Sequence, residues 1–230
     1  MAFFQKILEF DTEFFLYLNS FHNDFWDSIM LMVTRKETWI PFFAVILFFV
    51  FKNYRSKWWL VVFFLALTVL LADQLSVLLK ETIQRLRPVH NPEIEHLVHN
   101  VLRKGGLHGF VSSHAANSFA LFAFTTRLFR NRGYWFLMLC WAILFSYSRI
   151  YSGVHYPLDI LGGAVLGWLI GVGTYKVLMF TENYFFLAKI PKIETTNLDS
   201  RQSGLIFLVF CVVAATVVIM TSILHHYNYL

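Results

Sequence analysis

The chain has 230 residues, of which 57% are hydrophobic, 19% are aromatic and only 14% are charged, and its formal net charge is +5. Soluble domains contain less apolar and more charged sequence, and several runs approach the ~20 apolar residues that cross a bilayer core. The composition excludes an ordinary soluble domain and predicts an integral membrane protein. A charge this modest fits anionic lipid better than nucleic acid, which we do not expect to be a partner.

The first 30 residues are predicted to form an amphipathic helix that lies in the membrane interface. Apolar residues between Phe4 and Phe25 recur mostly at steps of three and four, which is the spacing of one helical face. A helix packed against the rest of the bundle fits this pattern equally well. Because Glu9, Asp11 and Glu13 interrupt the apolar run early, we do not expect a signal peptide.

Six apolar segments follow, and we predict that each is a transmembrane helix. They cover residues 38–51, 58–79, 115–129, 134–147, 158–180 and 204–224. The expected architecture is therefore all-α, a single membrane-embedded domain over residues 1–230 with a six-helix core at 38–224. In the fifth segment Gly163, Gly167 and Gly171 recur every four residues, which indicates close packing against another helix.

Basic residues cluster in three loops that the six segments place on one side. They are Lys52, Arg55 and Lys57; Arg127, Arg130 and Arg132; and Lys189, Lys192 and Arg201. Such an excess marks the cytoplasmic side of a membrane protein. The loops at residues 80–114 and 148–157 should therefore face outward together.

The outward loops carry charged groups, which are costly near a bilayer and so indicate function. The first stretch is KETIQRLRP, residues 80–88. Lys80 and Arg87 are two helical turns apart, so they share one face if the helix continues to Pro88, which would end it. Two cations on one face suit a phosphate, although such residues at a helix end also snorkel to lipid head groups.

The second stretch is GFVSSHAANSFA, residues 109–120. Ser112 and Ser113 come just before a predicted helix, whose N-terminus binds anions through free N–H groups and its dipole. His114 would lie beside that anion as a proton donor. A serine cap with an incidental histidine is the alternative.

The third stretch is SRIYSGVHYPLDI, residues 148–160. Pro157 suits the first turn of a helix. His155 and Asp159 are four residues apart, close enough for the carboxylate to hold the imidazole in one tautomer and make its other nitrogen a better nucleophile. Arg149 adds a planar fork suited to phosphate oxygens. A salt-bridged histidine at a helix start explains the stretch less well, because three costly groups converge.

Together these stretches predict one outward pocket with three cations, two histidines, two serines and one carboxylate. Metal sites for phosphate chemistry usually need several carboxylates, so we expect phosphoryl transfer through a histidine, with no metal and no cofactor. His96 and His99 could ligate zinc, but no further ligand joins them. We interpret their loop as a solvated border of the pocket.

The three motifs, in this order, resemble those of the type 2 phosphatidic acid phosphatase superfamily. Residues 80–88 match K-x6-RP, Ser112–His114 resembles PSGH, and residues 148–159 match SR-x5-H-x3-D. The six-segment layout is similar to the membrane branch of that family. Val111 replaces the family's proline and Ser113 replaces its glycine, which would matter if the glycine had positive φ.

The resemblance implies a role for each site residue. His155 would be the nucleophile that forms a phosphohistidine, with Asp159 orienting it, and His114 would protonate the leaving group and then activate water. The phosphoryl oxygens would be held by Lys80, Arg87, Arg149, Ser112 and Ser113.

The expected function is removal of phosphate from a lipid phosphate or diphosphate, in a bacterial inner membrane that the chain crosses several times, with the site facing the periplasm or exterior. Undecaprenyl diphosphate is the first choice of substrate, by family analogy. Lipid A, phosphatidylglycerol phosphate and phosphatidic acid are the alternatives. A non-catalytic lipid-phosphate-binding protein or transporter is the alternative from another class, and vanadate-dependent halide oxidation is a further rival. The sequence does not indicate which proteins are partners.

Overall fold

The computed structural model describes residues 2–102, 104–185, 192–193 and 196–227. Within these ranges the chain forms eight α-helices and no β-strand, as expected for an all-α protein. The helices are α1 Ala2–Asn19, α2 Asp24–Thr34, α3 Ile40–Tyr54, α4 Trp58–Ile83, α5 Ser113–Phe129, α6 Arg132–Tyr151, α7 Pro157–Phe185 and α8 Ser200–His226. Short 3-10 turns lie at Lys36–Trp39, Arg55–Lys57, Pro88–His90 and Glu95–Leu97.

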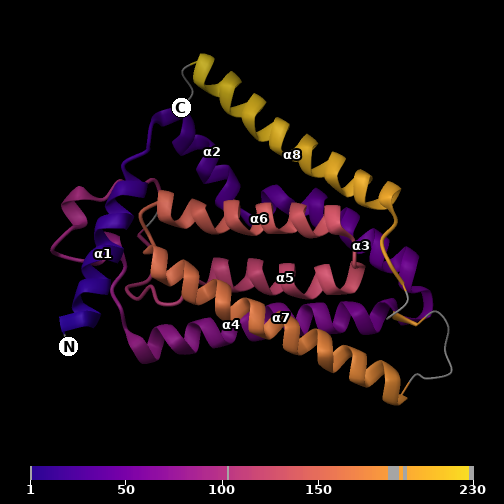
Figure 1. Ribbon diagram of the computed structural model, residues 1–230. Coiled ribbons are helices and arrows are strands. Elements are labelled where there is room, and N and C mark those ends of the chain that lie inside the picture. The colour runs from indigo at the N-terminus through magenta and orange to yellow at the C-terminus, as the bar shows by residue number, and fades with distance from the viewer. Residues whose placement is uncertain (1, 103, 186–191, 194–195, 228–230) are drawn as a thin grey trace.

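Helices α3 to α8 correspond to the six predicted apolar segments. Helix α5 lies in the middle of the bundle and contacts α4, α6 and α7 (Figure 1). On the other side of α6, helix α8 contacts α2, α3 and α6, and α2 also contacts α6. The central position of α5 explains why most of its side chains are buried.

Three stretches of the described chain are long and apolar enough to cross a membrane. They are Lys36–Ile83, which contains both α3 and α4, Pro157–Phe185 and Ser200–His226. These stretches make the chain a membrane protein. The count of six crossings stays a prediction.

The N-terminal region forms two helices rather than one. The break comes at Asn23, whose side chain accepts the backbone N–H of Trp26 at 2.9 Å and so caps α2. Helix α1 buries Asp11, Phe15 and Asn19, one turn apart, and contacts α6 and α7. Its other faces expose large apolar side chains, so α1 is a helix packed on the bundle with an apolar outer surface. Its location in the membrane interface stays a prediction.

The predicted glycine stripe forms the tightest helix contact. A Cβ atom placed at Gly167 would overlap the carbonyl oxygen of Ala116, and one at Gly171 would overlap that of Ala120. Glycine therefore lets the backbones of α5 and α7 touch, which confirms the packing interpretation.

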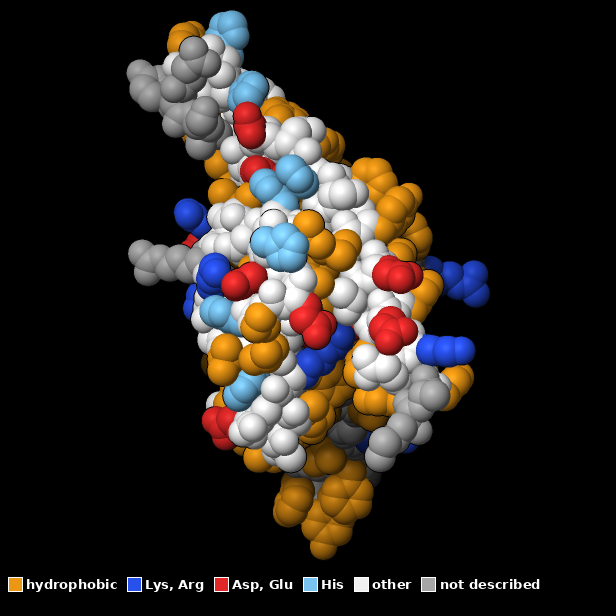
Figure 2. Space-filling model, turned by 90° about the vertical axis from the view of Figure 1, so that its left-hand side faces the viewer, with side chains coloured by type: hydrophobic (Ala, Val, Ile, Leu, Met, Phe, Trp, Pro, Cys, Tyr) orange, Lys and Arg blue, Asp and Glu red, His pale blue; other side chains and the backbone are white. Residues whose placement is uncertain are grey.

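The basic loops meet at one end of the bundle, as predicted. Asn53 and Gln202 exchange hydrogen bonds there at 3.0 and 3.1 Å, and Leu198 donates its N–H to the carbonyl of Phe129 at 2.9 Å. Lys189 lies outside the described residues. The loops that carry the three motifs lie at the opposite end, with α1 (Figure 1). Figure 2 faces that end, where acidic and histidine side chains are spread over the surface.

Candidate active site

Lys80 and Arg87 lie on different elements, Lys80 on α4 and Arg87 in the segment that follows it. Helix α4 ends at Ile83, and Gln84 follows in the left-handed conformation with φ of +52°. A helix that continues to Pro88, the condition under which both cations would share one helical face, is therefore not present. Arg87 instead lies in an extended segment that pairs with residues 107–109, where its N–H bonds the carbonyl of Leu107 at 3.0 Å and its Nε that of His108 at 3.1 Å.

Ser112 and Ser113 start α5, as predicted, but they have different surroundings. Ser112 is fully buried and is the N-cap; its side chain accepts the N–H of Ala115 and its own N–H bonds the carbonyl of Asp159. The hydroxyl of Ser113 accepts a hydrogen bond from Lys80 Nζ and lies 2.6 Å from that of Ser76. The serine in place of the family's glycine has helical geometry, so it introduces no strain.

His155 and Asp159 flank the start of α7, which begins at Pro157 as the sequence predicts. Nδ1 of His155 lies 3.4 Å from Oδ2 of Asp159, and the same oxygen accepts the N–H of Tyr156 at 3.0 Å. Both side chains are buried. Burial lowers the pKa of His155 to about 4, and the hydrogen bond to Asp159 opposes this shift. The imidazole is therefore neutral at pH 7, and a proton on Nδ1 leaves the lone pair on Nε2.

The loop before α5 passes directly over this pair. A Cβ atom on Gly109 would lie 2.9 Å from Oδ2 of Asp159 and 3.6 Å from Nδ1 of His155. The N–H of Gly109 also bonds the carbonyl of Arg85 at 2.8 Å, which fixes the loop. Glycine is needed here because a side chain would displace the carboxylate.

His114 is the second residue of α5. Its ring stacks on Phe145, with centroids 5.1 Å apart and an interplanar angle of 25°. It borders a cavity of about 260 Å³ between α3, α4, α5 and α6. Asn117 and Trp141 line the same cavity, and Asn117 Oδ1 and Trp141 Nε1 have no hydrogen-bond partner among the described residues. His114 thus borders a cavity that has aromatic walls and polar atoms without hydrogen-bond partners among the described residues.

Arg149 completes the group of cations. It lies in the last turn of α6, where Nη1 donates to the hydroxyl of Thr34 at 2.8 Å and Nε has no partner among the described residues. His114 lies within electrostatic range of Arg149, Arg87 and Lys80, and also of His155. The structure therefore brings the eight predicted residues into one cluster, with the hydroxyl of Ser112 used by the helix cap.

Sequence reasoning missed an ion-pair network behind Asp159. Arg85 donates from Nη1 to Oδ1 of Asp159 at 3.0 Å and from Nη2 to Oδ2 of Asp11 at 2.6 Å. Arg85 lies inside the first motif stretch, residues 80–88, so its position in the sequence indicated that it could belong to the site. Asp11 gave no such indication, because an acidic residue in an amphipathic helix is expected to face solvent.

The histidine-rich loop is tied to the N-terminal helices. Nε2 of His99 lies 2.9 Å from Oδ1 of Asp27, and its ring stacks on His22. Asn19 holds the same loop through the backbone N–H of His99 at 2.8 Å. No group of three possible metal ligands occurs among the residues that the structure describes. His99 is paired with a carboxylate rather than with His96.

Comparison with known proteins gives the class of protein to which the chain belongs. The PAP2 superfamily model matches residues 57–184. A lipid A 4'-phosphatase of Bacteroides thetaiotaomicron is 43% identical over 176 residues, which are 73% of this chain and 78% of the relative. Undecaprenyl-diphosphatase BcrC of Bacillus subtilis is 31% identical over 154 residues, 66% and 75% of the two chains. The crystal structure of Aquifex aeolicus LpxE superimposes with a TM-score of 0.57 and 26% identity, over 72% of this chain and 94% of that one.

Fold, site and relatives define a membrane phosphatase that hydrolyses lipid phosphates. The chain belongs to the PAP2 superfamily. The alternatives of a transporter and of a non-catalytic lipid-binding protein are thereby set aside.

Proposed function

We propose that this protein removes a phosphate group from a membrane lipid through a phosphohistidine on His155, without a metal ion. The proposal depends on one observation above all. The His155–Asp159 pair and His114 lie together among three cationic side chains at the end of the bundle where α4, α5, α6 and α7 meet.

In the first step, the Nε2 lone pair of His155 attacks phosphorus. The P–N bond forms as the P–O bond to the lipid breaks, and His114 donates its proton to the leaving oxygen. Asp159 accepts the Nδ1–H throughout, so the imidazole carries its positive charge beside a carboxylate.

In the second step, His114 takes a proton from water and the resulting hydroxide attacks phosphorus. The P–N bond breaks, inorganic phosphate leaves, and His155 returns to its neutral form. One water molecule is consumed, and the proton that His114 gives to the leaving group is replaced by the one it takes from water.

The cations stabilise the charge that builds up on the phosphoryl oxygens. Lys80, Arg87 and Arg149 are the cationic side chains, and the N-terminus of α5 adds N–H groups and the positive end of its dipole. Positioning and electrostatic stabilisation account for most of the catalysis of phosphoryl transfer. These side chains perform the role that metal ions have in other phosphatases.

A phosphorylated glycolipid of the lipid A type is the substrate we favour. The support is the lipid A 4'-phosphatase that is 43% identical over most of both chains. The cavity beside His114 agrees, because aromatic walls with isolated polar atoms suit a sugar ring as the leaving group. Undecaprenyl diphosphate, the first choice from the sequence, becomes the second candidate on the 31% identity to a relative of that name.

We further propose that the protein lies in the bacterial inner membrane with several crossings, and that its site faces outward. The support is the position of the basic loops at the end of the bundle opposite the site. An outward site would meet lipid head groups after their export.

The test compares two substrates on one purified preparation in detergent. Lipid A bisphosphate and undecaprenyl diphosphate are incubated with the protein, with and without a chelator, and phosphate release and product mass are measured. We expect loss of one phosphate from lipid A, unchanged by the chelator and absent in His155→Ala. Release from undecaprenyl diphosphate alone would favour the second candidate, and activity that needs added metal would contradict the mechanism.

A further inference from the structure

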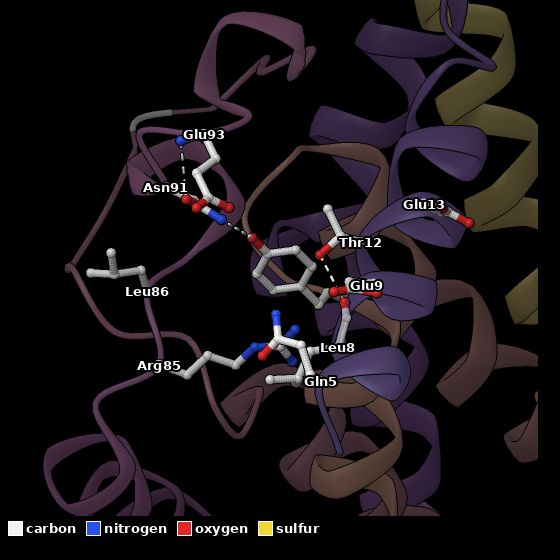
Figure 3. A pocket seen from close by; sticks show the side chains of 10 residues that line it. Gln5, Leu8, Glu9, Thr12, Glu13, Arg85, Leu86, Asn91 and Glu93 are labelled. Carbon is white, nitrogen blue, oxygen red and sulfur yellow. Dashed lines mark hydrogen bonds between the residues drawn. The ribbon is translucent and has the colours of Figure 1, made fainter. Parts of the chain in front are cut away.

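Arg85 joins two carboxylates that belong to different helices. Its guanidinium donates to Asp159 of α7 at 3.0 Å and to Asp11 of α1 at 2.6 Å, and it lies 4.0 Å from the ring centroid of Tyr156. In Figure 3 Arg85 extends from its loop towards α1, across the floor of a pocket between them. Only 18% of the Arg85 side chain is exposed. Hydrogen bonds and the aromatic ring therefore hold the planar guanidinium in one orientation.

Asp11 accepts a second hydrogen bond, which comes from the helix that carries Asp159. Its Oδ1 accepts the backbone N–H of Leu158, in the first turn of α7, at 2.9 Å, while its Oδ2 accepts from Arg85. Its side chain is 3% exposed. Burial raises the pKa of Asp11, and the bonds from Arg85 and Leu158 oppose this shift. Asp11 thus contacts both the arginine behind Asp159 and the helix that carries Asp159.

The bonds to Asp159 leave it one orientation. Oδ1 accepts from Arg85, and Oδ2 accepts from the N–H of Tyr156 and faces His155. Without Arg85 the carboxylate would lose the bond to Oδ1 that fixes its rotation. A carboxylate that turns away no longer orients the Nδ1–H of His155.

We propose that Arg85 and Asp11 are positioning residues for the His155–Asp159 pair, which makes helix α1 part of the catalytic apparatus. This inference rests on the proposed function, because it assigns the two residues to a nucleophile and its orienting carboxylate. Neither residue touches the reacting atoms. Their effect passes through Asp159 alone.

A second buried ion pair provides a matched control. Glu182 is also buried and also accepts from one cation, Lys57 at 2.6 Å, and from one backbone N–H, that of Ile193 at 2.7 Å. It lies at the opposite end of the bundle from the site. Glu182→Gln therefore removes the same kind of interaction as Asp11→Asn without touching the site.

The experiment measures kcat, KM and thermal stability for the full-length protein in detergent, with lipid A bisphosphate as substrate. We expect Asp11→Asn and Arg85→Gln to lower kcat about 10- to 100-fold with little change in KM, as for other groups that orient a reactive side chain. Arg85→Lys should restore part of the rate. Glu182→Gln should lose comparable stability and keep its kcat. In the Asp159→Asn background, Arg85→Gln should reduce kcat little further, because both changes remove the same orientation.

Each other outcome has a defined meaning. A kcat within twofold of wild type in both single variants, or losses that add fully to that of Asp159→Asn, would overturn the inference. Failure of both variants to fold would assign the pair to stability and would also overturn it. A wild-type protein that releases no phosphate from any lipid would instead remove the proposed function.

Discussion

Ser112 donates its backbone N–H to the carbonyl oxygen of Asp159 over 3.0 Å, so the first turns of α5 and α7 are bonded directly. The glycine stripe of α7 continues this contact along α5. Because α5 carries His114 and α7 follows His155, one helix interface sets the distance between the two histidines. The site therefore depends on close packing of these helices.

Gly167→Ala tests that dependence. A methyl group there meets the carbonyl of Ala116, so we expect the free energy of unfolding to fall by about 1–3 kcal/mol, as overpacking usually costs. Gly173 lies on the same helix with no atom near its Cβ position, so Gly173→Ala should be neutral or stabilise by up to ~1 kcal/mol. Thermal unfolding in detergent measures both. Equal shifts for the two variants would show that the contact is loose.

Asp159→Asn tests the orienting carboxylate. The amide keeps the shape but loses the negative charge beside His155, so kcat should fall by about 100-fold or more, within the range for acid–base and orienting groups. KM should change little, because the cations that hold phosphate remain. Steady-state kinetics on folded protein measures both constants, and an unchanged kcat would remove this role.

His114→Ala tests proton donation to the leaving group. The loss should be about 100-fold or more for a lipid alcohol and much smaller for a p-nitrophenyl ester, whose leaving group needs no proton. Phosphate release from the two classes of ester gives the comparison. Equal losses for both would contradict the role of His114 as the acid.

The pH dependence of His155 follows from its burial. Its pKa is lowered from the ordinary 6.5 to about 4, so the unfolded chain takes up this proton first as the pH falls. His155 therefore contributes stability above about pH 6.5, and that contribution is lost as the pH falls from 6.5 through 4. Between pH 6.5 and about 4, His155 of the folded protein remains neutral and can act as the nucleophile. NMR of 15N-labelled histidine, assigned with His155→Gln, should give a midpoint well below 6; a midpoint near 6.5 would contradict the buried environment.

The sequence predicted the parts of the site that depend on local pattern. Ser112 caps α5 and Pro157 starts α7 because capping and proline preferences act within a few residues. Lys80 and Arg87 do not share one helical face, since α4 ends at Ile83 and Gln84 adopts a left-handed conformation. Tertiary pairing of residues 85–87 with 107–109, which local spacing does not encode, places Arg87 instead.

Asp11 shows that a contact between distant parts of the chain cannot be predicted from a single sequence. The residue is 148 positions from Asp159, and only the fold brings α1 against the start of α7. An acidic residue in an amphipathic helix is expected to face solvent. Asp11 is instead buried against Arg85, although Glu9 and Glu13 of the same helix are exposed.

The most direct test of the account is to trap the covalent intermediate. The purified protein is mixed with lipid A carrying a radiolabelled 4'-phosphate, quenched within milliseconds, and digested for mapping. We predict label on His155 that is stable in base and lost in acid, as expected for a phosphoramidate, and no label in His155→Ala. Full turnover with label on another residue, or with none on the protein under conditions that slow the second step, would contradict a phosphohistidine mechanism.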